Sequence, residues 1–362
     1  MSIFFQLMIQ SDTKGKRTLK YCLVFCLLIS CTTIAQAEDG SGVNCPESQA
    51  TDARLHDEVW LLSCRSLACP EQGPSIDAET LTEGLAAWKY NLSDQQWDRS
   101  KMLDFLHSSE DCQTVVWVHG NLTTASEAFA TGLTVYRQLV RDTEIHPPIR
   151  FIIWSWPASK ILSRPVPDAR IKAARTTWAG IRLAGMLQQI PGHKSVGLIG
   201  FSFGAQVVSA ALEIIAGGEL NHTKIVPQGD RVSYRVTFFA AALDSYWLLP
   251  DRRFGKAFDV IDSLTLINNY CDWVLKHYGK LYCHCARRGP SALGYTGLPE
   301  GNFSREQKEK IRQFNASGSV GKQHAWRAYI QNRSTMDLIR EGTLPDWQDN
   351  PKQTLQVSTV SQ

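Results

Sequence analysis

Apolar residues in the middle of the chain form short continuous runs, with longer amphipathic stretches between them. The continuous runs cover residues 114–118, 149–156, 195–200, 236–243 and 264–269. Runs of this length predict strands that are buried on both faces, as in a parallel sheet. Weaker strand patterns cover residues 58–67, 85–90 and 310–314.

Helical spacing of apolar residues fills the intervals between these strands. It predicts helices over 125–140, 169–190 and 205–216, and the last two run into Pro191-Gly192 and Gly217-Gly218, which are helix stop signals. Strands that alternate with helices of this length indicate βαβ crossovers. We therefore predict an α/β fold with a mainly parallel sheet and helices on both of its faces.

The beginning of the chain has a different pattern. Four basic residues between positions 14 and 20 precede an apolar run over 21–30, and Ala35-Gln36-Ala37 follows it. This order predicts a secretory signal peptide over 1–37, because the run is shorter than the ~20 residues that cross a bilayer. We therefore expect an exported protein that is periplasmic, on the cell surface or extracellular.

A second processing site competes with this one. Residues 28–31 (LISC) resemble a bacterial lipobox, and acylation of Cys31 would tether the mature protein to a membrane. In either case we expect a linker over 38–57, a folded domain over 58–336 and a polar tail over 337–362.

Composition narrows the class of protein. Of the 362 residues, 43% are hydrophobic and 20% are charged, which is typical of globular proteins and excludes disordered, collagen-like and coiled-coil chains. The 38 basic and 35 acidic residues leave a net charge of +3, which is too balanced to indicate nucleic acid or an anionic membrane as a partner.

Ten cysteines are present, and Cys22, Cys26 and Cys31 lie in the predicted signal segment. The others would enter an oxidising compartment as an odd number, so at least one thiol stays free or pairs between chains. Cys283-His284-Cys285 is spaced more closely than zinc-binding pairs, and no second pair follows. We therefore predict neither a metal nor a cofactor.

The segment 200–204 (GFSFG) is the strongest candidate for chemistry. This G-x-S-x-G pattern directly follows a predicted strand and opens a predicted helix, which is the setting of a nucleophile elbow. Such a turn holds its serine in a strained backbone conformation, and Gly200 and Gly204 leave room for the neighbouring backbone. Ser202 would stand at a helix N-terminus, where developing negative charge is favoured.

Five motifs follow one another along the chain: HGN at 119–121, WSWP at 154–157, GFSFG at 200–204, ALD at 242–244 and NNYCDWVL at 268–275. Together they resemble the α/β-hydrolase superfamily, on its serine esterase and lipase side. WSWP is similar to a segment of an uncharacterised bacterial group of these hydrolases. The resemblance implies an eight-stranded, mainly parallel sheet, while residues 244–263 are a short connection, so we expect no large cap domain. It also implies a serine hydrolase that cleaves esters of small molecules or lipids through an acyl-enzyme.

The resemblance also indicates which residues assist Ser202. The backbone amides of Phe203 and Asn121 would form the oxyanion hole, because His119-Gly120-Asn121 ends the strand where the second amide donor is expected. His119 precedes the serine, so we expect it to orient its loop by hydrogen bonds rather than to act as a base.

Three histidines follow the serine late enough to be its base. His277 lies in a helical pattern and His284 sits between two cysteines, whereas His324 lies in a loop after the last predicted strand. We predict that His324 is the general base, because that loop is placed to reach Ser202.

Two aspartates compete as the acid that orients the base. Asp272 follows the strand over 264–269, as in most α/β hydrolases, and Asp244 ends the preceding strand, as in some lipases. We favour Asp272 and keep Asp244 as the alternative. An acyl-binding wall is also expected, formed by Phe201, Phe203, Trp247, Leu248 and Leu249.

Other functions fit the same residues. An amidase or thioesterase would use the same three side chains, because the leaving group is not encoded in the motif. A non-catalytic binding protein on this fold would be favoured if Ser202 and His324 lay out of reach of each other. A surface-anchored structural protein would depend on Cys31 alone.

Overall fold

The structure is a computed structural model, and it describes residues 54–68, 76–108, 112–141, 148–190, 195–226, 232–281 and 290–345. The predicted signal segment, Cys31 and most of the predicted linker lie outside these ranges, as do Cys283-His284-Cys285 and residues 346–362. Export, acylation and the fate of these cysteines therefore stay predictions.

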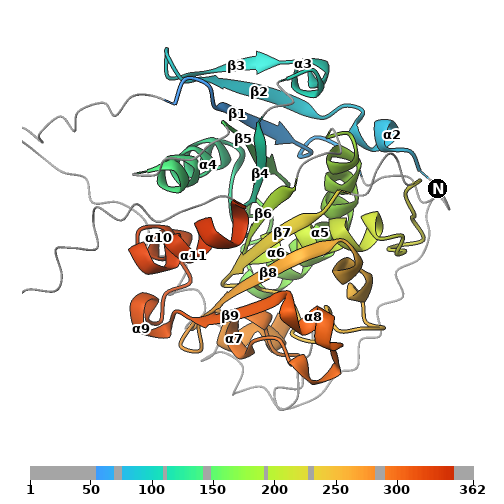
Figure 1. Ribbon diagram of the computed structural model, residues 1–362, viewed down its shortest axis with the longest axis vertical. Coiled ribbons are helices and arrows are strands. Elements are labelled where there is room, and N and C mark those ends of the chain that lie inside the picture. Colours follow the sequence, from blue (N-terminus) through green and yellow to red (C-terminus); the bar gives the residue numbers. More distant parts are fainter. Residues whose placement is uncertain are drawn as a thin grey trace, which may run out of the picture. The chain divides into compact units, whose positions relative to one another are not determined.

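Nine strands form one sheet in the described residues, with β3 at one edge and β9 at the other (Figure 1). Along the sheet they are β3 (Gln96–Ser100), β2 (Ala86–Asn91), β1 (Glu58–Ser63), β5 (Ile149–Ser155), β4 (Gln113–Val118), β6 (Val196–Phe201), β7 (Tyr234–Phe239), β8 (Ile261–Asn268) and β9 (Ile311–Asn315). All neighbours from β1 to β9 pair in parallel, and only β2 and β3 run antiparallel to their neighbours. The mainly parallel sheet predicted from the sequence is confirmed.

Helices cover both faces of this sheet (Figure 1). α5 (Pro165–Gln188) and α6 (Phe203–Ile215) pack together on one face, and α4 (Ala125–Val140) and α11 (Arg333–Thr343) lie on the other. The shorter elements are α2 (Ala78–Thr82), α3 (Met102–Leu106), α7 (Leu293–Thr296), α8 (Arg305–Glu309), α9 (Ser317–Val320), α10 (Trp326–Ile330) and the 3₁₀ helices η1 (Gly255–Asp259), η2 (Leu275–Leu281) and η3 (Glu300–Asn302). None of the described helices is both long and apolar enough to cross a bilayer.

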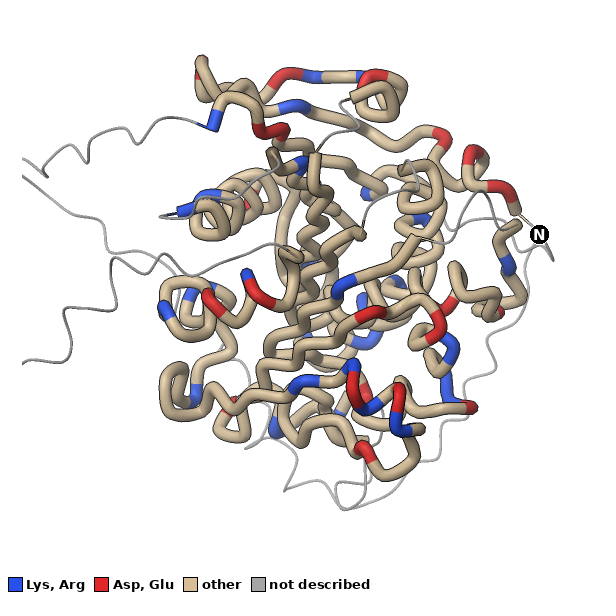
Figure 2. The backbone as a smooth tube through the Cα atoms, viewed as in Figure 1, with Lys and Arg blue, Asp and Glu red and all other residues tan. Residues whose placement is uncertain are grey.

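The middle of the sheet forms the core. Every residue of β4, β5 and β6 is buried, and β4 and β6 contain no charged residue. Figure 2 shows the same contrast, because the tubes of the central strands are almost entirely uncharged while the outer segments carry most of the Lys, Arg, Asp and Glu. Strands covered on both faces exclude charge because an unpaired ion costs much free energy away from water.

The sheet has nine strands rather than the eight that the resemblance implied, because β3 adds an antiparallel edge. Its sequence, QWDRS, has a single large apolar residue, and all five positions are exposed or partly so at the sheet edge. Trp97 packs against Tyr90 and Phe129, with ring centroids 5.1 and 5.0 Å away. Packing rather than periodicity therefore fixes this strand.

The predicted end of the domain at residue 336 is wrong, because α11 continues to Thr343 and packs on the sheet. A Cβ at Gly342 would lie 2.5 Å from Thr237 Oγ1 of β7 and 2.6 Å from Thr265 Oγ1 of β8, so the helix approaches the strands closely. Arg340 donates to the carbonyls of Gln138, Leu139 and Arg141 at the end of α4. These interactions make residues 337–344 part of the domain.

The start of the domain also lies earlier than residue 58. Asp57 is buried, and its carboxylate accepts hydrogen bonds from the Ile149 amide (2.9 Å) and the Tyr136 hydroxyl (2.8 Å). Arg54 pairs with the same carboxylate at 2.6 Å. The last residues of the predicted linker therefore belong to the folded unit.

Candidate active site

Ser202 occupies the turn between β6 and α6, as predicted. Its backbone has φ +53° and ψ −120°, a left-handed conformation that non-glycine residues adopt at a cost of order 1–3 kcal/mol. Its carbonyl accepts hydrogen bonds from the amides of Ala205 (3.1 Å) and Ala242 (3.2 Å), which hold the turn in place. The side chain therefore projects from a rigid corner at the carboxyl edge of the sheet.

The two glycines of the motif are required by close approach of other backbone. A Cβ at Gly204 would lie 2.1 Å from the carbonyl oxygen of Val118 in β4, and one at Gly200 would lie 2.9 Å from Ala205 Cα. Neither contact leaves room for a side chain, because real Cβ atoms do not approach backbone so closely. The sequence interpretation of Gly200 and Gly204 matches this geometry.

His324 reaches Ser202 from the loop between α9 and α10. Its Nε2 lies 2.9 Å from Ser202 Oγ, and its Nδ1 lies 2.7 Å from Asp272 Oδ2. An ionised carboxylate only accepts hydrogen bonds, so Nδ1 carries the proton and Nε2 is left to accept from the serine hydroxyl. The structure thus joins three predicted residues into one hydrogen-bonded chain.

Asp272 lies just beyond β8 and is completely buried. Its Oδ1 accepts hydrogen bonds from the amides of Val274 (2.9 Å) and Leu275 (3.0 Å), while Oδ2 pairs with His324. These bonds satisfy the carboxylate and fix its direction, which a buried charge requires.

Asp244, the alternative acid, does not contact His324. Its carboxylate accepts a hydrogen bond from the Tyr246 amide at 2.9 Å, and its backbone forms a bridge to Ala292. Burial raises the pKa of the Asp244 carboxyl, and the Tyr246 amide and the charge of Arg252 only partly oppose this. The structure therefore places Asp272, and not Asp244, beside the histidine.

Asn269 is a residue of this site that the sequence interpretation did not single out. Its fully buried side-chain amide donates to the carbonyls of Gly321 (2.8 Å) and Gln323 (3.4 Å), on either side of Lys322 and just before His324. Its Oδ1 accepts from the Cys271 amide at 3.0 Å. Asn269 thereby ties the loop that carries Asp272 to the loop that carries His324. Its only sequence signal is a polar residue at the end of a buried strand.

The turn after β4 lies directly against the elbow. A Cβ at Gly120 would lie 3.0 Å from Ser202 Cβ and 2.8 Å from the Phe201 ring. Within the described residues, the backbone amides of Asn121 and Phe203 donate to no protein acceptor. Both predicted oxyanion-hole residues therefore keep an unused backbone donor next to Ser202.

His119 holds that turn in place and is not a base. Burial and the positive charge of Arg65 lower its pKa to about 3, so the ring is neutral at pH 7. Its Nδ1–H donates to the Gly120 carbonyl at 3.0 Å, and its Nε2 accepts from the Trp156 amide (3.3 Å) and from Arg65 Nη2 (3.2 Å). This agrees with the orienting role expected for it.

Arg65 is a second residue that the sequence did not reveal. Besides His119, its guanidinium donates to Ser155 Oγ (2.6 Å), Ser159 Oγ (3.2 Å) and the Thr123 carbonyl (3.0 Å). Burial lowers its pKa to about 10, which leaves it charged at neutral pH. Arg65 thus connects β1 to the turn that contains Asn121.

The remaining candidates take no part in this arrangement. His277 lies in η2, where its Nδ1–H donates to the Trp273 carbonyl at 2.8 Å, and His284 lies outside the described residues. Leu248 and Leu249 of the expected acyl wall are buried in the core, and Trp247 packs edge-on against Phe254 at 5.5 Å. Among the described residues, no group of three or more His, Cys, Asp or Glu is placed to hold a metal ion.

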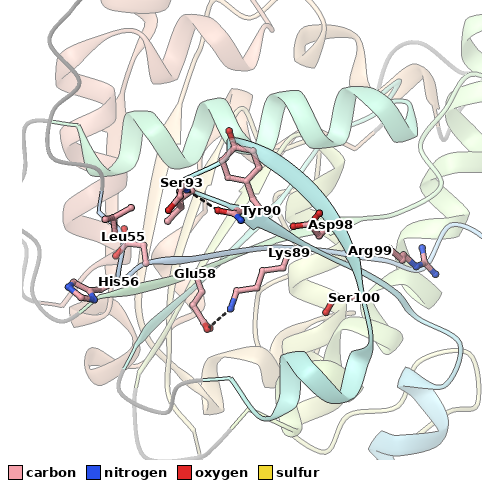
Figure 3. A pocket seen from close by; sticks show the side chains of 12 residues that line it. Leu55, His56, Glu58, Lys89, Tyr90, Ser93, Asp98, Arg99 and Ser100 are labelled. Atoms are coloured by element: carbon pink, nitrogen blue, oxygen red, sulfur yellow. Dashed lines mark hydrogen bonds and ion pairs between the residues drawn. The ribbon is translucent and has the colours of Figure 1, made fainter.

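A pocket of about 440 Å³ lies far along the sheet from this chemistry, against the residues before β1 and parts of β2 and β3 (Figure 3). Figure 3 shows the Lys89–Glu58 ion pair, 3.0 Å long, on its wall. None of the predicted site residues lines this pocket.

Part of the chain matches a known family. Residues 94–244 match the model of a family described as "Alpha/beta hydrolase of unknown function (DUF900)". The match includes Ser202 and the turn at Asn121 but ends before Asp272 and His324. A crystal structure of an inhibited esterase B from Lactobacillus rhamnosis is similar to the chain, with 11% identity, a TM-score of 0.36, and coverage of 79% of this chain and 85% of that chain. No curated protein matches the sequence.

Proposed function

We propose that the chain is an α/β hydrolase of the serine type, which cleaves carboxylic esters through an acyl-enzyme; residues 94–244 match a family of α/β hydrolases. The observation that supports this is the chain of hydrogen bonds from Ser202 through His324 to Asp272, at 2.9 and 2.7 Å. These distances match those of an activated nucleophile with its base and the group that orients the base. They also bring Ser202 and His324 within reach of each other, which favours catalysis over a role in binding alone.

In the proposed first half-reaction, His324 Nε2 takes the proton from Ser202 Oγ as Oγ attacks the carbonyl carbon of the ester. The carbonyl oxygen becomes negative and is stabilised by the amides of Phe203 and Asn121, each worth roughly 3–4 kcal/mol of barrier. The protonated His324 then gives its proton to the alcohol oxygen as the carbon–oxygen bond breaks. Asp272 stabilises the imidazolium without itself taking a proton.

In the second half-reaction, water takes the place of the alcohol. His324 removes a proton from the water as its oxygen attacks the acyl carbon, and then returns a proton to Ser202 Oγ as the acid leaves. The turn, its two glycines and the loop with His324 are all positioned before substrate binds. Ser202 therefore does not have to move out of its buried position in order to react. Preorganised donors lower the barrier most when they need no rearrangement during the reaction.

The first test is labelling of the folded protein with a fluorophosphonate probe, which reacts with activated serines. We expect the wild type to be labelled, Ser202→Ala to lose all labelling, and His324→Ala to lower the labelling rate by roughly 10⁴-fold or more. His277→Ala is the matched control, because this histidine also follows β8 but its ring donates to the Trp273 carbonyl and not to the catalytic residues described here. A folded wild type that the probe does not label would contradict the proposal.

A second measurement separates the ester from its competitors. Hydrolysis of a p-nitrophenyl ester, the matching p-nitroanilide and the matching thioester compares three leaving groups on one acyl chain. We expect the highest kcat/KM for the oxygen ester. A higher kcat/KM for the anilide or the thioester would still support the proposed triad, but it would contradict the proposed preference for oxygen esters.

A further inference from the structure

Exposed apolar side chains gather in the loops around the candidate active site. Ile161 and Leu162, in the loop between β5 and α5, are 43% and 39% exposed. Tyr270, Trp273 and Val274, in the loop after β8, are 45%, 38% and 42% exposed. Large apolar side chains grouped in this way on a surface are typical of a site of interaction.

Direct contacts connect these loops to each other. Asp168 in the first turn of α5 accepts hydrogen bonds from the amides of Ile161 (2.7 Å) and Leu162 (2.8 Å). Arg170, two residues further on, donates to the Leu281 carbonyl of η2 at 2.5 Å. At the other end of the same segment, the Trp273 amide donates to the Lys322 carbonyl at 3.3 Å. We call the exposed residues of segments 160–164, 270–280 and 322–327 the rim.

The charges of the rim are of one sign. Its basic residues are Lys160, Arg164, Lys276, Lys280, Lys322 and Arg327, all of them exposed. Its one acidic residue, Asp272, is fully buried against His324. Lys276 Nζ lies 5.6 Å from the Trp273 ring, so one cationic and one aromatic group of the rim lie together. The small net charge of the whole chain conceals this local excess.

We propose that the rim binds the surface of an anionic lipid bilayer. Aromatic and aliphatic side chains enter the region of the headgroups, where Trp and Tyr are favoured, while lysines keep their charged ends at the phosphates. Each basic residue near such a surface contributes about 1 kcal/mol to the free energy of binding, which corresponds to about a fivefold gain in affinity. The balanced overall charge argued against such a partner, but the rim presents only positive charge to the bilayer.

This orientation has a consequence for the site. Asp272 and His324 lie in the same segments as the rim, so a bilayer bound there faces the loop that carries His324 to Ser202. The binding itself does not depend on the proposed hydrolase activity, and Ser202→Ala is expected to bind as well as the wild type.

The test is co-sedimentation of the full chain with vesicles of phosphatidylcholine alone or mixed equally with phosphatidylglycerol. We expect binding to the mixed vesicles that weakens strongly when salt is raised, because screening acts on surface charges. Lys160→Glu/Lys280→Glu should lower the apparent affinity by at least about 25-fold, from two basic charges at about fivefold each. Lys308→Glu, an exposed lysine on α8 outside the rim, is the matched charge control and should bind as the wild type does.

The apolar part of the rim is tested with Ile161→Asn/Leu162→Asn. These side chains are exposed and only their backbone bonds to Asp168, so the fold should be retained. We expect at least a tenfold loss of affinity for the mixed vesicles, since each fully inserted aliphatic side chain contributes more than this. Leu103→Asn, a 58% exposed leucine on α3, is the apolar control.

Three results would overturn the proposal. If every variant binds both vesicle types equally, the binding is assigned to the N-terminal segment and not to the rim. If the wild type binds neither vesicle type, the rim does not bind membranes. Self-association that Ile161→Asn/Leu162→Asn abolishes, without binding to vesicles, would make a second copy of this chain the partner. A wild type that binds the mixed vesicles but hydrolyses no ester would reject the proposed function, whereas the proposal that the rim binds lipid would stand.

Discussion

The loops that follow β7 and β8 begin alike and end with different partners. Each leaves the carboxyl end of a parallel strand, and each has an aspartate whose Oδ1 accepts the amide two residues later at 2.9 Å. After β7, Asp244 lies against the segment before α7, where the Leu293 amide donates to the Leu243 carbonyl at 2.6 Å. After β8, Asp272 lies against the loop of His324.

The difference shows that residue type and position at a strand end do not by themselves select the acid. Both aspartates satisfy the local turn, but only Asp272 has its second oxygen directed at a histidine, while the backbone of Asp244 bridges to Ala292. What separates them is which distant segment packs on each loop. Segment 290–297 bonds to both loops, through Leu243 after β7 and Asn269 after β8, whereas segment 316–325, which carries His324, bonds to the β8 loop.

The strongest test exchanges each acid for its amide. Asp272→Asn should lower kcat/KM for a p-nitrophenyl ester by roughly 10⁴-fold, because the amide no longer holds His324 in the tautomer that accepts from Ser202. Asp244→Asn should change kcat/KM by less than about threefold, since Asp244 touches no catalytic atom. A loss in Asp244→Asn as large as in Asp272→Asn, with both proteins folded by circular dichroism, would reverse the assignment.

The next test breaks the connection between the β8 loop and the histidine loop. Asn269→Ala removes the hydrogen bonds to Gly321 and Gln323, so His324 should shift and kcat should fall by about 10²-fold. Asn268→Ala is the matched control, because this neighbouring buried asparagine bonds to Gln313 instead, at 3.1 Å. It should lose stability without a comparable loss of kcat. If Asn268→Ala and Asn269→Ala lose kcat equally, Asn269 has a purely structural role. An unchanged KM in Asn269→Ala would support its role in positioning His324.

Much of this arrangement could be predicted from the sequence, and the exceptions share a physical cause. The strands over 114–118, 149–156 and 195–200 and the turn at Ser202 carry local patterns strong enough to define them. Arg65 and Asn269 act on residues more than 50 positions away, and no local pattern encodes such a contact. β3 and α11 are likewise fixed by tertiary packing, which overrides weak propensity.

The choice between Asp244 and Asp272 lies between the features that a local pattern defines and those that only tertiary contacts define. Both local sequences are compatible with a strand-end acid, so the sequence narrowed the acid to two residues and favoured Asp272 by its position alone. The decision depends on the course of the chain between β9 and α10, which brings His324 over β8. Tyr270 shows the same dependence, because its amide donates to Ser317 Oγ in that returning segment at 2.9 Å.

A smaller effect is expected on stability at the β7 loop. Asp244→Ala removes the acceptor of the partly buried Tyr246 amide, which should lower the free energy of unfolding by about 1 kcal/mol. Urea denaturation measures this, and Asp244→Asn, whose side-chain oxygen still accepts, should lose less. If both variants have the kcat of the wild type, the β7 loop has only a structural role. If kcat instead falls in Asp244→Ala, where the hydrogen bond is lost, Asp244 contributes to the active site.

The smallest effect expected is the pH dependence of that stability. Burial raises the pKa of Asp244 in the folded protein above its ordinary value of 3.8, so the fold favours the protonated carboxyl. The stabilisation linked to this proton is complete below 3.8 and is lost as pH rises through the raised pKa. The stability of the wild type relative to Asp244→Asn should therefore fall between about pH 3.8 and that pKa and then stay constant, as followed by urea denaturation in steps of pH. A difference that grows with pH instead would mean that a positive partner holds Asp244 as a carboxylate, and the purely structural role assigned to the β7 loop would then be wrong.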